Sequence, residues 1–179
     1  CIKVHGTKAL LLAFETTILQ TQHALESQIK KLIPEGKWAF RDRIDSDAVS
    51  ERGYFVDAIL QHKNSELTID FTQTEQQADG PINFIMDESV PKFMLGLYLT
   101  RDMPGIIMNA GFVRALGEIK TAPGTLLSPL SPAPLGLRSH SMFRVNSAIF
   151  GCLVQAMNGQ GSAASCVYVL YYLRGKKSS

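Results

Sequence analysis

Five charged or amide residues stand in apolar stretches of the sequence, where a polar side chain needs a partner. They are Asp70, Asn83, Arg114, Arg138 and Arg144. Side chains of this kind either bind a ligand or satisfy backbone hydrogen-bonding groups, and the second role is the more frequent one. The chemistry they offer is therefore recognition by charge and hydrogen bonding, with a structural role as the alternative.

The histidines do not form a metal-binding pattern. The chain has His5, His23, His62 and His140, and no two of them are one, three or four residues apart, as a metal site within one element requires. His23 falls inside a predicted helix and His62 in a predicted hairpin turn, so both are interpreted as structural or solvated. The sequence predicts no metal site.

Three further motifs are weak matches to catalytic or binding sites. Ser139 and Ser141 flank His140, but sequence neighbours rarely form a nucleophile–base pair, and a helix N-cap is the preferred interpretation. The run Asp45-Ser46-Asp47 lacks the glycine and the glutamate of an EF-hand loop. The glycine-rich run 159–164 follows a helix, whereas a dinucleotide fingerprint follows a strand. No complete catalytic set is predicted.

Hydrophobic periodicity predicts the elements that position these residues. A helix over Thr7–Ile33 carries an apolar stripe, interrupted at Thr21-Gln22, and ends at Pro34-Glu35-Gly36. Strands are predicted around Trp38 and Phe40, over 54–60 and over 66–72, with the acidic loop Asp42 to Glu51 between the first two. Lys63-Asn64-Ser65 makes the last two an antiparallel hairpin with one face packed and one wet.

The second half of the chain contains predicted helices over Ser89–Thr100 and from Ser139 or Ser141 onward, with a short apolar segment, 112–119, between them. A buried strand is predicted over Val167–Leu173. Between residues 123 and 134 four prolines exclude a helix and a central strand. Because leucines flank these prolines, we expect a rigid, extended strap clamped between the sheet and the last helix, with Arg114, Arg138 and Arg144 around it.

Composition and length predict one domain over residues 1–179. The predicted fold is α+β, a mixed and mostly antiparallel sheet packed against two or three helices, with the proline-rich strap. The net charge of +2 and the scattered Lys and Arg argue against nucleic acid. No apolar run is long enough to span a membrane, and no signal peptide is present at the start. Three widely spaced cysteines, Cys1, Cys152 and Cys166, favour a reducing, cytoplasmic setting with buried thiols.

An ordered set of motifs resembles the hydantoinase B family, which also includes 5-oxoprolinase and subunits of acetone and acetophenone carboxylases. The matching runs are Pro34-Glu35-Gly36, Ile44-Asp45-Ser46-Asp47, Asp70-Phe71 followed by Gly80-Pro81-Ile82-Asn83, Asn109-Ala110-Gly111 with Arg114, Pro123-Gly124-Thr125-Leu126-Leu127, and Pro132-Ala133-Pro134-Leu135 with Arg138. Three positions depart from the family pattern: Gln73 and Ala48 replace glycines, and Gln76 replaces a proline.

The resemblance implies the central part of a longer B-type subunit of an ATP-dependent cyclic-amide hydrolase or ketone carboxylase. This part would supply scaffold and a substrate-cavity wall and would not be active alone; the alternative is a non-catalytic assembly module that lacks the metal-binding half. The resemblance further implies a hetero-oligomer with a hydantoinase A-like ATPase subunit, ATP on that subunit, and a divalent metal N-terminal to the matched region.

The same resemblance selects Asn83, Arg114 and Arg138 as candidate substrate-binding residues. Arg138 suits a carboxylate, a bicarbonate or a phosphorylated intermediate, because a guanidinium pairs with planar oxyanions through two hydrogen bonds. The catalytic residues and the substrate, whether cyclic amide, 5-oxoproline or ketone, stay open at this point.

Overall fold

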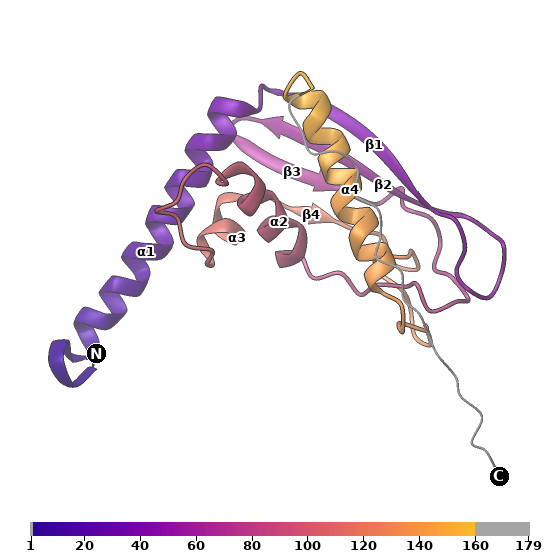
Figure 1. Ribbon diagram of the computed structural model, residues 1–179, viewed down its shortest axis with the longest axis horizontal. Helices are drawn as coiled ribbons and strands as arrows, with labels where there is room; N and C mark the ends of the chain where they lie inside the picture. The colour runs from indigo at the N-terminus through magenta and orange to yellow at the C-terminus, as the bar shows by residue number, and fades with distance from the viewer. Residues whose placement is uncertain (1, 160–179) are drawn as a thin grey trace, which may run out of the picture.

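A sheet with strand order β1-β2-β3-β4 organises the described residues, 2–159, of this computed structural model (Figure 1). β1 (Gly36–Ile44), β2 (Tyr54–Lys63) and β3 (Glu66–Asp70) are antiparallel neighbours, and the short β4 (Ile119–Lys120) runs parallel to β3. The side chains of one face alternate with those of the other along each strand. On β2 the residues of one face are buried and those of the other face are half-buried.

The predicted β2–β3 hairpin is confirmed, and its turn explains the register. Lys63 pairs with Glu66, so Asn64 and Ser65 alone form the turn, with φ values of 51° and 67°. Two positive φ values are the signature of a type I′ turn, which matches the twist of the flanking strands. The predicted acidic loop began and ended too early, because β1 continues to Ile44 and the connection to β2 spans residues 45–53.

The helices are α1 (Ile2–Leu32), α2 (Ser89–Leu99), α3 (Gly111–Ala115) and α4 (Ser139–Ala156). Gly6 interrupts α1 with a φ of 77°, so the regular helix starts at Thr7, as predicted. The segment 112–119 is divided between α3 and β4. The N-cap prediction for Ser139 or Ser141 was wrong: Arg138 occupies the cap position without a side-chain cap, and the Ser141 hydroxyl donates to the carbonyl of Ile82 instead.

The core lies between the buried face of the sheet and the helices. α4 packs across β1 and β2, where Val145, Ile149 and Cys152 meet the sheet. The Cys152 thiol donates to the carbonyl of Ala58 at 3.4 Å, and burial raises the pKa of this thiol to about 11. The predicted α+β class and the buried Cys152 are therefore confirmed. Cys1, Cys166 and the predicted strand 167–173 lie outside the described residues.

Within residues 2–159, no helix has the length and apolar character needed to cross a membrane.

Candidate functional site

Four of the six matched motifs converge on one end of the sheet, where three loops interlock. We call this region the loop cluster and define it as residues 45–53, 73–86 and 121–138. All three loops lie near the start of α4 (Figure 1).

Asp47 joins the first loop to the second through a fully buried carboxylate. Its Oδ1 accepts hydrogen bonds from the amides of Val49 and Ser50 at 3.0 and 2.7 Å, and its Oδ2 accepts from the Tyr54 hydroxyl at 3.0 Å and the Gly80 amide at 3.1 Å. These donors, led by the Ser50 amide, hold the pKa of Asp47 well below its usual range. Only a glycine fits at position 80, because an added Cβ would lie 2.1 Å from the Asp47 carbonyl oxygen.

Asn83 joins the second loop to the strap. Its Oδ1 accepts from the Ala78 amide at 2.8 Å, and its Nδ2 donates to the carbonyls of Ala78 at 2.8 Å, Gly80 at 3.2 Å and Pro134 at 3.1 Å. The side chain is fully buried. Asn83 therefore positions the loop and the strap, and its amide is already satisfied by backbone groups. Its role as a candidate substrate-binding residue stays a prediction.

The first half of the strap extends the sheet sideways. The amide of Glu75 donates to the carbonyl of Phe55, at the start of β2, at 3.0 Å. The amide of Leu126 donates to the Glu75 carbonyl at 2.9 Å, and that of Gln77 to the Gly124 carbonyl at 2.8 Å. The expected clamp between sheet and helix was therefore wrong in its geometry, because the strap lies beside residues 75–77 as a further edge segment.

The two halves of the strap differ in burial. Leu126 and Leu127 are fully buried, and their carbonyls accept from Phe84 and Met86 at 2.8 and 3.1 Å. The segment 130–138, in contrast, is exposed or half-exposed along its whole length. We call the exposed segment 130–138 the rim of the strap. The buried segment around Leu126 and Leu127 supports this rim.

Arg138 is the predicted site residue that lies on this rim. Its side chain is exposed, and no ion pair or hydrogen bond joins its guanidinium to another residue in the 2–159 range. The backbone around it is held by the amide of Leu137, which donates to the Pro81 carbonyl at 2.8 Å. A cation on a fixed backbone that faces solvent is suited to bind an anionic group.

Arg114 lies outside the loop cluster, because its motif joins α3 to α1. The side chain of Asn109 donates to the Thr21 hydroxyl at 2.8 Å, and Gly111 lies so close to α1 that an added Cβ would be 2.5 Å from the Ile18 carbonyl oxygen. Arg114 donates to Glu15 of α1 at 2.8 Å. The structure therefore separates Arg114 from Asn83 and Arg138.

The other two polar residues singled out in the sequence also have partners in the structure. Arg144, on α4, donates to Asp42 of β1 at 3.0 Å, with both side chains largely buried. Asp70 accepts from the amide and the hydroxyl of Thr72 at 2.8 and 2.6 Å at the end of β3. Both contacts stabilise the fold, in line with the structural role expected for most of these groups.

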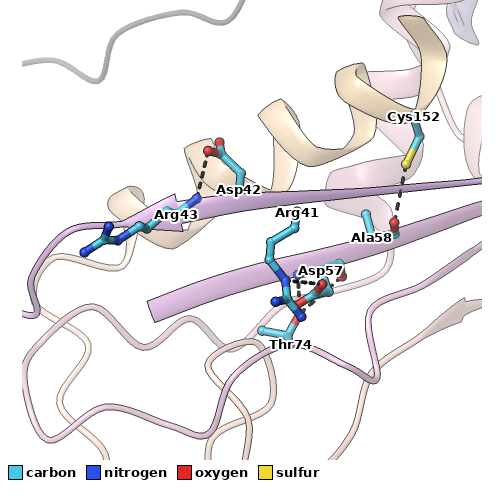
Figure 2. A network of polar contacts seen from close by, with 7 residues as sticks. All are labelled: Arg41, Asp42, Arg43, Asp57, Ala58, Thr74 and Cys152. Atoms are coloured by element: carbon cyan, nitrogen blue, oxygen red, sulfur yellow. Dashed lines mark hydrogen bonds and ion pairs between the residues drawn. The ribbon is translucent and has the colours of Figure 1, made fainter. Parts of the chain in front are cut away.

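Sequence reasoning missed a polar group on the half-buried face of the sheet. Arg41 donates to Asp57, its cross-strand neighbour, at 2.8 Å, and Asp57 is also hydrogen-bonded through its backbone to Thr74 at 3.3 Å. Figure 2 shows this pair on the side of the strands opposite Cys152 and α4. The pairing of Arg41 with Asp57 depends on the register of β1 and β2, which the sequence does not reveal. Neither residue belongs to a recognisable motif.

Two adjoining hollows of about 350 and 300 Å³ share Arg41, Asp57 and Gln73 as lining residues. The Asp57 Oδ2 atom is buried without a hydrogen-bond partner among the described residues. These hollows offer the Asp57 carboxylate beside a guanidinium, and the larger one is also lined by Glu75, which is paired with Arg52 at 3.0 Å. An ion pair that fastens β1 to β2 accounts for the arrangement without a ligand.

The implied divalent metal has no fitting site in the described part of the chain. No three His, Cys, Asp or Glu side chains gather there in a way that could hold an ion. The buried carboxylate of Asp47 is saturated by protein donors. We therefore derive no step through a metal on these residues.

Comparison with known proteins now decides the family. The model of the family described as hydantoinase B/oxoprolinase matches residues 1–177. The chain belongs to this family. The resemblance stated from the motifs is thereby confirmed over nearly the whole chain.

The relatives are much longer than this chain. An uncharacterised protein of Methanocaldococcus jannaschii is 24% identical over 165 residues, which cover 92% of this chain and 28% of that protein. The nucleotide-free structure of acetone carboxylase has a TM-score of 0.74 at 15% identity and matches 89% of this chain and 22% of its own. The ATP-dependent caprolactamase of Pseudomonas jessenii has a TM-score of 0.68 at 18% identity, with 87% and 26% covered. At these identities the two structures show that the fold is shared.

Proposed function

We propose that this chain is the central part of the B-type subunit of an ATP-dependent enzyme that hydrolyses cyclic amides, as hydantoinase and 5-oxoprolinase do, or carboxylates ketones. The family membership supports this class, and the matched fold in an acetone carboxylase and a caprolactamase supports both branches of it. The chain spans about a quarter of those proteins. It is therefore proposed to contribute to a larger active unit and to be inactive alone.

Within that unit, the proposed role is scaffold and substrate-cavity wall. The observation that carries this role is the interlocking of four of the family motifs in the loop cluster. Asp47 and Asn83 join three loops through buried hydrogen bonds, which leaves the rim of the strap rigid and exposed. A rigid wall favours binding because little conformational entropy is lost when a ligand is ordered against it.

Other parts of the assembly would supply the reactive chemistry. We propose a hydantoinase A-like ATPase subunit that binds ATP and activates a carbonyl, enolate or bicarbonate oxygen by phosphorylation. A divalent metal would be held by residues N-terminal to the matched region. The cytoplasm, where ATP is available, is the proposed location.

Arg138 is proposed to bind the anionic group of the substrate or of the phosphorylated intermediate. We expect Arg138→Met, measured in the complex that contains this chain, to lower kcat/KM by about tenfold to a hundredfold, because a charge-assisted hydrogen bond of about 1.5–3 kcal/mol is lost. Arg101→Met is the matched control, since Arg101 is also exposed but lies at the end of α2. Unchanged turnover and substrate affinity in Arg138→Met would refute the role.

A non-catalytic assembly module is the second candidate function. The exposed apolar side chains of the N-terminal half of α1 favour it, because such surfaces mark protein contacts. Co-purification discriminates the two readings: an actin-like ATPase partner with bound metal and turnover supports the enzyme. A stable complex that contains this chain but has neither metal nor turnover supports the module.

A further inference from the structure

The N-terminal half of α1 extends beyond the rest of the molecule (Figure 1). The C-terminal half packs on the body through Thr21, Leu25 and Ile29, which are all buried. We call residues 7–17 the α1 extension, since they precede these contacts and are exposed along nearly their whole length. An isolated helix of this length gains little stability from its own hydrogen bonds.

The helix face that packs on the body continues onto the α1 extension, with Thr21 interrupting its apolar stripe. Leu11, Phe14 and Ile18 precede Thr21 and Leu25 in steps of three and four residues, which keeps all five on one helix face. On the body this face meets α3, whose Gly111 approaches the helix backbone closely. On the extension, Leu11 and Phe14 are 61% and 58% exposed. The helix face that packs against α3 on the body is therefore uncovered on the α1 extension.

We propose that a second copy of this chain covers the stripe, with the two α1 helices antiparallel about a two-fold axis. Steps of three and four residues are the pattern of a helix seam that packs on another helix. In a two-fold contact, each residue i that meets residue j is matched by j meeting i. When Leu11 lies opposite Phe14 of the second copy, the two-fold axis also places Phe14 opposite Leu11 of the second copy. Both apolar residues are therefore covered in both molecules.

Charge supports the antiparallel register. Lys8 and Glu15 flank the stripe on the same side, and the register that places Leu11 opposite Phe14 brings each Lys8 next to Glu15 of the second copy. Glu15 already accepts a hydrogen bond from Arg114 of its own molecule at 2.8 Å. In the dimer, each Glu15 would therefore contact two cations, Arg114 of its own molecule and Lys8 of the second copy. A parallel pair would place Lys8 next to no acid and would force both bodies into the same space, because the body lies on the stripe's side of α1.

A second exposed apolar group lies where the stripe enters the body. The carbonyl of Ile107 accepts from the Thr21 hydroxyl at 3.2 Å, and the side chains of Ile107 and Met108 are exposed. In the antiparallel register, Thr7 of the second copy lies opposite Ile18, one turn before Thr21. The regular helix of the second copy therefore ends close to this exposed apolar group.

Sedimentation equilibrium of the full 179-residue chain tests the proposal. We expect a dimer for the natural sequence and a monomer for Leu11→Glu, which places a charge in the seam. Leu12→Glu is the matched control: Leu12 is 66% exposed, is adjacent in sequence and lies about 100° around the helix, so this variant should remain dimeric. Circular dichroism verifies that both variants are folded, as the exposure of both positions predicts.

A charge exchange tests the register. Lys8→Glu should weaken the dimer roughly threefold to thirtyfold, because two ion pairs become like-charge contacts. The double variant Lys8→Glu, Glu15→Lys should recover most of the loss. Arg114→Gln, alone and added to the double variant, measures how much of the change in dimer stability comes from the Arg114–Glu15 ion pair within each molecule.

A natural chain that is monomeric at every concentration would overturn the proposal and would assign the stripe to a different partner, including further residues of a longer polypeptide. Equal loss of the dimer in Leu11→Glu and Leu12→Glu would overturn it too. A double variant weaker than Lys8→Glu would contradict the antiparallel register. None of these outcomes depends on the proposed enzymatic role.

Discussion

The loop cluster and the α1 extension, at two ends of the molecule, differ in opposite ways in the regularity of their backbone and in how well their side chains are buried or paired. The loop cluster has little regular secondary structure, yet its buried polar groups are paired through Asp47 and Asn83. The α1 extension is fully helical, yet its apolar side chains are exposed. Regularity of the backbone therefore does not indicate which part of this protein is complete on its own.

This difference indicates which end of the molecule needs a partner to cover its surface. Buried hydrogen bonds in the loop cluster satisfy the backbone without outside help, so this end can act as a fixed wall. The α1 extension satisfies its backbone but leaves apolar area in water, which is favourable to cover. Five predictions test this contrast, in order of decreasing effect.

Asp47→Ala should destabilise the chain most, by about 3–5 kcal/mol, because the amides of Val49, Ser50 and Gly80 would lose their buried acceptor. Urea denaturation measures the change. Asp45→Ala is the matched control from the same motif, since the Asp45 side chain is 94% exposed and should contribute almost nothing. Equal effects of the two substitutions would show that the carboxylate is not a structural link.

Stability should depend on pH through the same residue. The folded-state pKa of Asp47 is depressed, so its stabilising contribution is complete above the unfolded value of about 3.9 and is lost as the pH falls toward the folded value. The difference in urea midpoint between the natural chain and Asp47→Ala should therefore shrink between pH 5 and pH 3, values chosen to be about one unit on each side of that pKa. A constant difference would contradict the assignment.

Asn83→Ala should cost about 2–3 kcal/mol, because the Ala78 amide and the carbonyls that Asn83 serves lose a buried partner. Thermal unfolding should show a decrease in Tm of roughly 4–10 °C for a chain of this size. Gln73→Ala, which removes an exposed amide from the same loop, provides the control and should leave Tm unchanged. If the two variants unfold together, the strap is held by other contacts.

Ala48→Gly should stabilise the chain by about 0.5–1 kcal/mol. Ala48 has a φ of 68°, a left-handed conformation that costs a residue with a Cβ about 1–2 kcal/mol, and glycine avoids part of this cost. The family pattern has glycine at this position. Ala13→Gly, in the exposed part of α1, should instead lose about 1 kcal/mol. Destabilisation by Ala48→Gly would contradict the strain.

Leu11→Ala should change stability least, by less than about 0.5 kcal/mol, when the protein is dilute enough to be monomeric. Leu25→Ala, at a buried position of the same stripe, should cost about 2–5 kcal/mol. The ratio of these two effects, measured by urea denaturation, defines where the body ends along α1. A large loss at Leu11 in the monomer would place the boundary nearer the N-terminus.

The sequence by itself determined the elements and the family. Local signals were sufficient for the helix from Thr7, the hairpin at Asn64-Ser65 and the helix 89–99, because periodicity and turn chemistry act between neighbouring residues. The ordered motifs were sufficient for the family, although none of them identifies a catalytic residue. Ala48, where the family pattern has glycine, was visible as a departure before its positive φ was known.

Only the tertiary structure decided what the motif residues do. Asp47 reaches Gly80, and Asn83 reaches Pro134, across long stretches of sequence, so no local pattern reveals that their side chains are saturated. The same holds for the Arg41–Asp57 pair, which depends on strand register, and for Arg114, which packs on α1 far from Arg138. The physical reason is that a buried polar group is defined by its partners, and partners are chosen by the packing of the whole chain.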